Sequence, residues 1–385
     1  MITPLLSARM NCLRWVAAVL VLISHLKPML FVEYPHLKEK GLLINLFYLV
    51  TGLGHEAVIV FFVMSGLLVG GLSVERYRKH RFVPSDFVIQ RFSRIYIVLI
   101  PALLVGFMWD QLGLQHFNAA GLYTESPKFR MDGIAANQLS WNLLLENSLM
   151  MQHISVPILG TNGALWSISY EWWCYGLFFF GFYFLVSWMQ REPRFHYGLL
   201  ALLILALLSL DVMRYFSIWL IGVAVLFSPL RKVRCNRLFG YGLLLATILW
   251  SRIDQSNGQA VLGIERGFIR DLVVAGACFF LFTALNQCTT RPKRANNLHH
   301  ALASFSYTTY LVHVPFMVLT VSIFHRFFGL PVLEQPSVSG MLCFLFVGLL
   351  VYFYSYCFSL VTERYTEPMR NWLHGWLSPI PVKRS

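Results

Sequence analysis

Long runs of apolar residues, separated by short polar and basic segments, follow one another along nearly the whole chain. A helix needs about 20 such residues to cross the roughly 30 Å hydrocarbon layer of a bilayer. The pattern predicts ten spans, at residues 10–30, 56–74, 93–112, 163–189, 197–211, 212–229, 238–252, 268–288, 303–328 and 340–362. Residues 42–50 are too short to span, so we expect them at the membrane interface. The predicted fold is an all-α polytopic membrane helix bundle.

The composition agrees with this pattern and excludes a soluble enzyme. Hydrophobic residues make up 57% of the 385 residues and charged residues only 13%, whereas a soluble domain has about 25% charged residues. The seven cysteines are scattered and include no CxxC pair, so they indicate neither a disulfide framework nor a metal site. The first apolar run lacks a signal-peptide cleavage pattern, and we expect it to be retained as a span.

The net charge of +13 would suggest nucleic acid in a soluble protein, but here topology accounts for it. With the N-terminus in the cytoplasm and ten spans, 21 of the 31 Lys and Arg residues fall on the cytoplasmic side. This asymmetry predicts that both termini are cytoplasmic, and we expect no nucleic-acid partner. We expect one transmembrane domain over 1–370, a short cytoplasmic tail over 371–385 and no further domain. The cytoplasmic set includes the loop residues Arg231, Lys232, Arg234, Arg291, Lys293 and Arg294 and the tail residues Lys383 and Arg384.

Two ionisable residues in the first span are the first candidates for chemistry. Arg14 and His25 are eleven positions apart, which is about 20° beyond three full turns and about 16 Å along a helix axis. They therefore share one face of the predicted helix, with Arg14 near the cytoplasmic surface and His25 in the outer half. Ionisable side chains within spans usually face the bundle interior and mark functional sites. A snorkelling arginine with a hydrogen-bonded core histidine would also fit this pattern.

Further polar residues lie in other spans. Arg91 and Arg94 share a face at the cytoplasmic end of the third span and suit phosphate, although contact with anionic lipid would explain them as well. Glu171, within the fourth span, has Trp166, Trp172 and Trp173 as neighbours. This group fits either an interfacial aromatic belt or a sugar site.

Two more segments complete the set of candidates. Tyr310 and His313 lie three positions apart in the ninth span and thus share a face, although a hydrogen-bonded core histidine is an equal alternative. Ser65-Gly66 and Gly70-Gly71 are small residues that favour close helix contact. Glu56, at the outer end of the second span, is expected to be solvated. GxSxG, HExxH, P-loop and GxGxxG motifs are absent from the sequence, and we expect no metal.

These segments together resemble the membrane acyltransferase-3 family. The resemblance rests on R-x10-H in the first span, FFVMSG at 61–66, RFSRIY at 91–96, LWSISYEWWCY at 165–175, SYTTYLVHVPF at 306–316 and TERYTEPMR at 362–370, which occur in the family's order. It covers nearly the whole chain. One departure is Ile97, where the family's arginine block usually has proline; Pro101 comes later.

The resemblance implies an integral-membrane O-acyltransferase of the bacterial cytoplasmic (inner) membrane, surrounded by membrane lipid. It implies acyl-CoA, by default acetyl-CoA, as the cytoplasmic donor and a hydroxyl of an extracytoplasmic glycan or lipid-linked saccharide as acceptor. We expect His25 to be the general base, with Glu171 and His313 as further catalytic residues. Counting residues from the ends of the predicted spans places both His25 and Glu171 in the outer half of the membrane, so we expect Glu171 either to pair with His25 or to bind the acceptor. Arg14, Arg91 and Arg94 would bind the donor, and Trp166, Trp172, Tyr310 and Ser65 would contact substrate.

Other functions are compatible with the same buried residues. A proton-coupled secondary transporter also uses intramembrane His, Glu and Arg, although the sequence shows neither an inverted repeat nor paired broken helices. A receptor or scaffold would not need polar residues distributed over three separate spans. Direct acyl transfer and an acyl-histidine intermediate are both compatible with the sequence.

Overall fold

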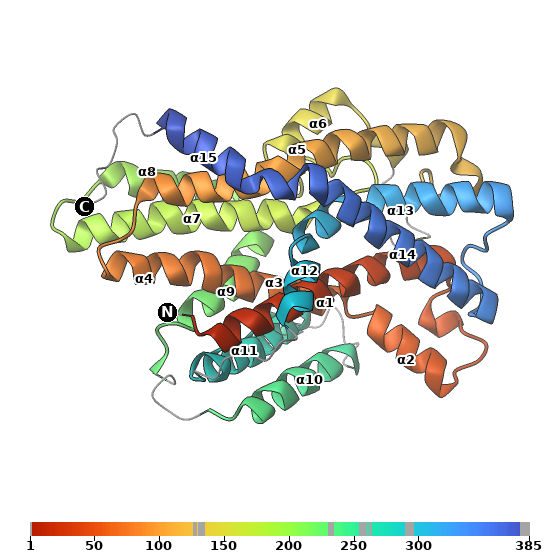
Figure 1. Ribbon diagram of the computed structural model, residues 1–385, viewed down its shortest axis with the longest axis horizontal. Helices are drawn as coiled ribbons and strands as arrows, with labels where there is room; N and C mark the ends of the chain where they lie inside the picture. Colours follow the sequence, from red (N-terminus) through yellow and green to blue (C-terminus); the bar gives the residue numbers. More distant parts are fainter. Residues whose placement is uncertain are drawn as a thin grey trace.

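The computed structural model describes residues 2–125, 129, 135–229, 235–253, 260–261, 264–288 and 296–377. The basic loop residues predicted to be cytoplasmic at 231–234 and 291–294, and the tail beyond 377, lie outside these ranges. The described elements are almost all helical (Figure 1). The α-helices are α1 Pro4–Leu30, α2 Leu42–Thr51, α3 Gly54–Ser65, α4 Leu72–Arg78, α5 Pro84–His116, α6 Trp141–Ser148, α7 Leu165–Met189, α8 Phe195–Leu207, α9 Leu210–Ala224, α10 Arg237–Ile253, α11 Arg266–Asn286, α12 Asn296–Ala303, α13 Ser306–Phe328, α14 Val338–Val361 and α15 Thr366–Leu377.

Shorter elements connect these helices. A π-helical segment, η2 Gly66–Gly71, joins α3 to α4, and the two short strands β1 Ala260–Val261 and β2 Ile264–Glu265 pair in antiparallel fashion. The 3-10 turns in the described ranges are η1 Tyr34–His36, η3 Asn118–Ala120, η5 Ala135–Asn137 and η7 Glu363–Tyr365.

The helices confirm an all-α polytopic membrane bundle. Within the described ranges, seven helical segments are long and apolar enough to cross a membrane: Pro4–Leu30, Leu42–Arg78, Pro84–His116, Leu165–Met189, Arg266–Asn286, Ser306–Phe328 and Val338–Trp376. The other three predicted spans correspond to α8, α9 and α10, which have 13, 15 and 17 residues. The count of ten and the cytoplasmic placement of the termini therefore stay predictions.

Helix α1 occupies the centre of the bundle and brings several distant segments together. It packs against α3, α12, α13 and α14 (Figure 1). Thr3 caps its first turn by accepting a hydrogen bond from the Leu6 amide, and Pro4 follows in the first turn, where a missing N–H costs nothing. Ala18 and Val21, which lie between Arg14 and His25 on the same face, are almost completely buried. The face that carries Arg14 and His25 is thereby held inside the protein.

The segment from α3 to α4 packs closely against α9, as its small residues predict. At both Gly66 and Gly222 an added Cβ atom would collide with the backbone of the opposite helix, at Trp219 and Val63 respectively. The chain therefore needs glycine on both sides of this contact. The π-helical segment begins at the same place, and such segments are frequent near functional sites.

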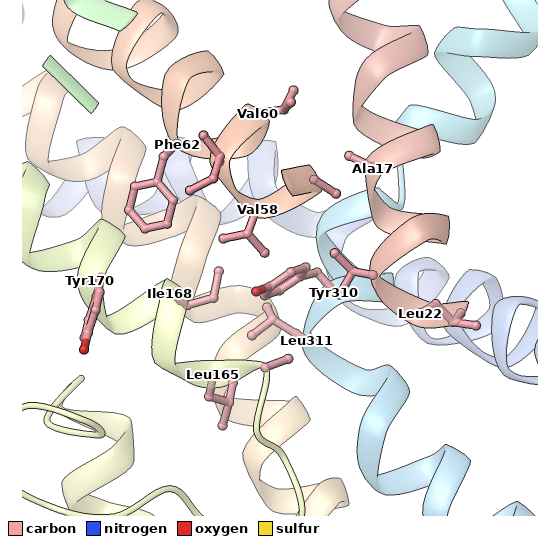
Figure 2. Close-up of a cluster of buried hydrophobic side chains, with 14 of the residues drawn as sticks. Ala17, Leu22, Val58, Val60, Phe62, Leu165, Ile168, Tyr170, Tyr310 and Leu311 are labelled. Atoms are coloured by element: carbon pink, nitrogen blue, oxygen red, sulfur yellow. The ribbon is translucent and has the colours of Figure 1, made fainter. Parts of the chain in front are cut away.

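Buried apolar side chains fill the space between α1, α3, α7 and α13. Figure 2 shows Val58, Leu165, Ile168, Tyr310 and Leu311 in this cluster, and each of them is buried. The cluster lies between two polar regions of the protein.

Candidate active site

The two histidines predicted from separate spans are direct neighbours. His25 Nδ1 lies 2.8 Å from His313 Nε2, and the rings stack with centroids 5.1 Å apart. His313 is fully buried, and its Nδ1 lies 3.0 Å from the Thr309 carbonyl oxygen and 2.9 Å from that of Tyr310. Helices α1 and α13 thus contribute one imidazole each to a pair in which His313 is buried and His25 is half-buried.

The hydrogen bonds determine where the protons lie. A carbonyl oxygen only accepts, so His313 Nδ1 carries a hydrogen, and the neutral His313 ring then accepts at Nε2. His25 must donate from Nδ1 to this atom. When His25 is neutral, its Nε2 keeps a free lone pair. The backbone of α13 therefore sets, through His313, which nitrogen of His25 is available for chemistry.

On one side of the apolar cluster lies a cavity of about 320 Å³, here called the arginine cavity. It is lined by Arg14 of α1, Arg76 of α4, and Arg91 and Arg94 of α5, together with Ser65, Ser167, Glu171, Tyr175, Tyr307 and Tyr310. Tyr175 and Tyr307 face the guanidinium groups of Arg91 and Arg94 at 5.9 and 5.8 Å. A neighbouring cavity of about 280 Å³ shares Arg76 and Arg91 and extends toward Arg81.

The positive charge of the arginine cavity is not neutralised by close ion pairs. In the described part of the chain, no carboxylate lies within 4.0 Å of Arg14, Arg91 or Arg94. Arg91 Nε is buried without a hydrogen-bond partner. Arg14 and Arg91 are half-buried and Arg94 is exposed to the cavity side. Holding several cations close together without counter-ions is unfavourable, and an anionic ligand with several oxygen atoms would offset this repulsion. Guanidinium groups match phosphate oxygens in this way.

A directed chain of hydrogen bonds holds Glu171 in the arginine cavity. Tyr175 donates to Glu171 Oε1 at 2.5 Å and so accepts from Ser65 at 3.0 Å, while Trp219 Nε1 donates to Ser65 at 3.1 Å. Each donor in this series of hydrogen bonds has one acceptor. Glu171 is therefore a fixed negative charge among the arginines.

On the other side of the cluster lies a cavity of about 1070 Å³, here called the histidine cavity. His25 lines it, and so do Trp166, Tyr170 and Tyr215, whose rings contact one another with centroids 5.1–5.6 Å apart. Ionisable side chains also line this wall, among them His55, Glu56, Asp211, Arg214, Arg252, Glu265, Arg270 and Asp271. Aromatic faces beside hydrogen-bonding groups suit a polyhydroxylated ligand.

A thin partition separates the two cavities, which share no lining residue. On α13, Tyr310 lines the arginine cavity and Val314 lines the histidine cavity. Four residues of helix correspond to about 6 Å. Tyr310 closes the partition by a 2.5 Å hydrogen bond to Ser167. The His25–His313 pair lies at this boundary, because His313 sits between Tyr310 and Val314 on the same helix.

The family model for the acyltransferase domain matches residues 7–357. The chain belongs to the membrane acyltransferase-3 family. Neither a curated protein nor a solved structure matches it. Membership shows that the protein is an acyltransferase, an activity that the transporter and receptor alternatives do not include. It leaves the donor, the acyl group and the acceptor open.

The structure of this acyltransferase separates the predicted site residues into groups. Arg14, Arg91, Arg94, Ser65, Glu171 and Tyr310 line the arginine cavity, whereas His25 and Trp166 line the histidine cavity. His313 belongs with the second group, because it contacts His25. Trp172 lines neither cavity and packs against Tyr96, with ring centroids 5.3 Å apart. It lies on a different face of α7 from Glu171, as its position one residue later requires.

The expected pairing of Glu171 with His25 is corrected by the structure. Ser167 on α7 is bonded to Tyr310 on α13, Glu171 lies one turn beyond Ser167, and His313 lies one turn beyond Tyr310 in the opposite direction. Glu171 is therefore about 10 Å from His313 along the helix axes, and His25 lies beside His313. Counting residues from the ends of the spans placed them at one depth, because it did not include the relative shift of α7 and α13.

Sequence reasoning missed two features of the histidine cavity. Glu56 was expected to be solvated, but it is only 3% exposed, and Ser251 donates to its Oε1 at 2.8 Å. His55 Nε2 lies 2.7 Å from Asp271 Oδ1. The consecutive His55-Glu56 at the start of an apolar span was the available signal. Asp271 is separated from His55 by more than 200 residues, so no local pattern indicated the pair.

Proposed function

We propose that the protein transfers an acyl group, by default acetyl, from acyl-CoA to a hydroxyl group of a glycan or lipid-linked saccharide outside the cytoplasm. The observation that carries this proposal is the His25–His313 pair at the boundary of two chemically different cavities. One cavity is suited to a phosphorylated donor and the other to a polyhydroxylated acceptor. We also propose that the protein lies in the bacterial cytoplasmic membrane, surrounded by membrane lipid.

The donor would bind through Arg14, Arg91 and Arg94. Coenzyme A carries its phosphates at one end and the thioester at the end of a long flexible arm. With the phosphates among the arginines, the thioester can extend along α1 toward His25, about 16 Å away along the axis. On this route its acyl end would pass near Tyr310 and Ser167, which are hydrogen-bonded to each other and both line the arginine cavity.

The acceptor would bind in the histidine cavity, where its hydroxyl reaches His25. His25 Nε2 takes the hydroxyl proton as the oxygen attacks the thioester carbonyl. The carbon–sulfur bond then breaks, an ester forms, and the proton passes to the coenzyme A sulfur to give the free thiol. His313 keeps the reactive nitrogen of His25 deprotonated and stabilises the charged ring by accepting its Nδ1 hydrogen. His313 is accordingly a positioning residue.

Trp166, with Tyr170 and Tyr215, would contact the apolar face of a sugar ring, while the charged groups of the same wall bind its hydroxyls. The three rings pack edge to face and support one another. This wall favours a saccharide over an aliphatic alcohol as the acceptor.

The test is to compare envelope saccharides from cells with and without the protein by mass spectrometry. We expect ester-linked acyl groups that are present with the wild-type protein and absent with His25→Ala. Identical saccharides in all three strains would contradict the proposal. Binding of acetyl-CoA to purified His25→Ala serves as the control that this variant is folded.

A further inference from the structure

His55 and Asp271 form an imidazole–carboxylate pair that the proposed mechanism does not use. His55 is the second residue of α3 and Asp271 lies in the second turn of α11. The side chain of His55 is 48% exposed and that of Asp271 13%. Both residues line the histidine cavity, as does His25. The pair therefore presents an oriented imidazole to the proposed acceptor.

The pair lies close to the part of α1 that carries His25. An added Cβ atom at Gly54, the residue before His55, would collide with the side chain of Ser24, the residue before His25. Helices α1 and α3 thus touch at this level. A ligand that reaches His25 from the histidine cavity has His55 within the same wall.

The hydrogen bond to Asp271 determines how His55 meets a ligand. The carboxylate accepts, so His55 Nε2 carries the hydrogen. Within the described ranges no hydrogen bond engages Nδ1, which in the neutral ring is an acceptor with a free lone pair. The fixed carboxylate holds the ring in one orientation, as in other histidine sites supported by an outer carboxylate. Glu56 and Arg270 are the other charges that act on His55.

We propose that His55, oriented by Asp271, accepts a hydrogen bond from a second hydroxyl of the acceptor saccharide and so selects which hydroxyl faces His25. This inference rests on the proposed function. It makes His55 a specificity-determining residue and Asp271 a positioning residue. A ligand with one isolated hydroxyl could not use both imidazoles, whereas a sugar with neighbouring hydroxyls could.

Two amide substitutions separate this role from a purely structural one. In His55→Gln the amide lies near the position of Nε2 and can still donate to Asp271, but the Nδ1 acceptor is lost. In His55→Asn the amide lies near the position of Nδ1. A pair that only joins α3 to α11 would be preserved best by glutamine. A pair that binds a ligand through Nδ1 would be restored better by asparagine.

The experiment uses the full-length protein in proteoliposomes, with acetyl-CoA as donor. The acceptor probe is envelope saccharide from cells lacking the protein, with its esters removed by mild base. We expect His55→Gln to raise the acceptor KM roughly tenfold, which corresponds to the loss of about one hydrogen bond between protein and ligand. We expect acetyl-CoA affinity to stay within twofold, and His55→Asn to recover part of the loss. Asp271→Ala should resemble His55→Gln, while His196→Gln, a histidine outside both cavities, should match wild type.

Several outcomes would overturn the inference. These are an unchanged acceptor KM in His55→Gln, equal losses in the glutamine and asparagine variants, or a parallel loss of acetyl-CoA affinity that marks a damaged fold. A shift in the position of the transferred acetyl group, mapped by NMR of the product, would support it further. Failure of the wild-type protein to acylate the saccharide at all would instead contradict the proposed function.

Discussion

His313 accepts a hydrogen bond from His25 at 2.8 Å and donates its own Nδ1 hydrogen to the backbone of α13. This relationship leaves His25 Nε2 as the reactive nitrogen. The two residues are 288 positions apart, and neither could be assigned a tautomer from its own segment. The proposed catalytic function of His25 therefore depends on the packing of α1 against α13.

Replacing His313 tests this dependence. His313→Leu removes the acceptor for His25 Nδ1, so the ring loses both its orientation and its preferred tautomer. We expect kcat to fall roughly 100-fold, within the range for disturbed general-base catalysis, with acetyl-CoA affinity unchanged. His313→Gln places an amide oxygen near Nε2 and should retain more activity. Steady-state kinetics with both substrates gives the answer, and a normal kcat for His313→Leu would refute the positioning role.

The arginine cavity predicts the donor-binding residues. Arg14→Ala, Arg91→Ala and Arg94→Ala should each weaken acetyl-CoA binding roughly tenfold or more, since each removes charge-assisted hydrogen bonds to phosphate. Binding to wild type should weaken as salt is raised. Arg14→Lys should retain part of the affinity, because lysine still provides a point charge. Isothermal titration measures these constants, with Lys79→Ala, paired with Glu75 outside the three cavities, as control.

Because Glu171 lines the arginine cavity, we expect it to affect the affinity for the donor and not the KM for the acceptor. Glu171→Gln removes a negative charge from the arginine cavity while keeping an acceptor for Tyr175. The anionic donor should then bind a few-fold more tightly, and the acceptor KM should hardly change. Measuring both constants in this variant distinguishes the two cavities. A raised acceptor KM with unchanged donor affinity would restore the pairing with His25 that the sequence suggested.

Trp166 and Trp172 of α7 allow a matched comparison of two variants that tests where the acceptor binds. Trp166→Ala removes one ring of the aromatic wall and should raise the acceptor KM several-fold, the usual effect of losing one aromatic contact. Trp172→Ala removes the same side chain from a position outside both cavities and should leave that KM unchanged. If both variants behave alike in acceptor titrations, the histidine cavity does not bind the acceptor.

The contact between α3–α4 and α9 makes a prediction about stability. Gly66→Ala and Gly222→Ala each push a methyl group into an opposing backbone and should cost about 1–3 kcal/mol. Thermal unfolding in detergent should show a lower Tm for both. Gly181→Ala is the control, because an added Cβ atom there meets nothing within 4 Å. Equal Tm values for the three variants would contradict the described packing.

The sequence predicted the helices well because apolar runs of membrane length depend on local composition alone. The bounds of α7, predicted at 163–189 and found at Leu165–Met189, illustrate this. It also located Arg14, His25 and His313, since ionisable residues within spans are costly and conspicuous. It did not predict the shift of α7 against α13 that removes Glu171 from His25, nor the pairing of His55 with Asp271. Both depend on contacts between helices that are distant in the chain.

Acyl transfer between two separate cavities through His25 is tested most directly by a sided assay. Proteoliposomes are loaded with radiolabelled acetyl-CoA, the deacylated saccharide is added outside, and label bound to external saccharide is followed with time. We predict transfer by wild type in the orientation that exposes the arginine cavity to the lumen, and loss of transfer in both His25→Ala and Arg14→Ala. Undiminished transfer by His25→Ala, or transfer only when donor and acceptor share one side, would contradict this mechanism.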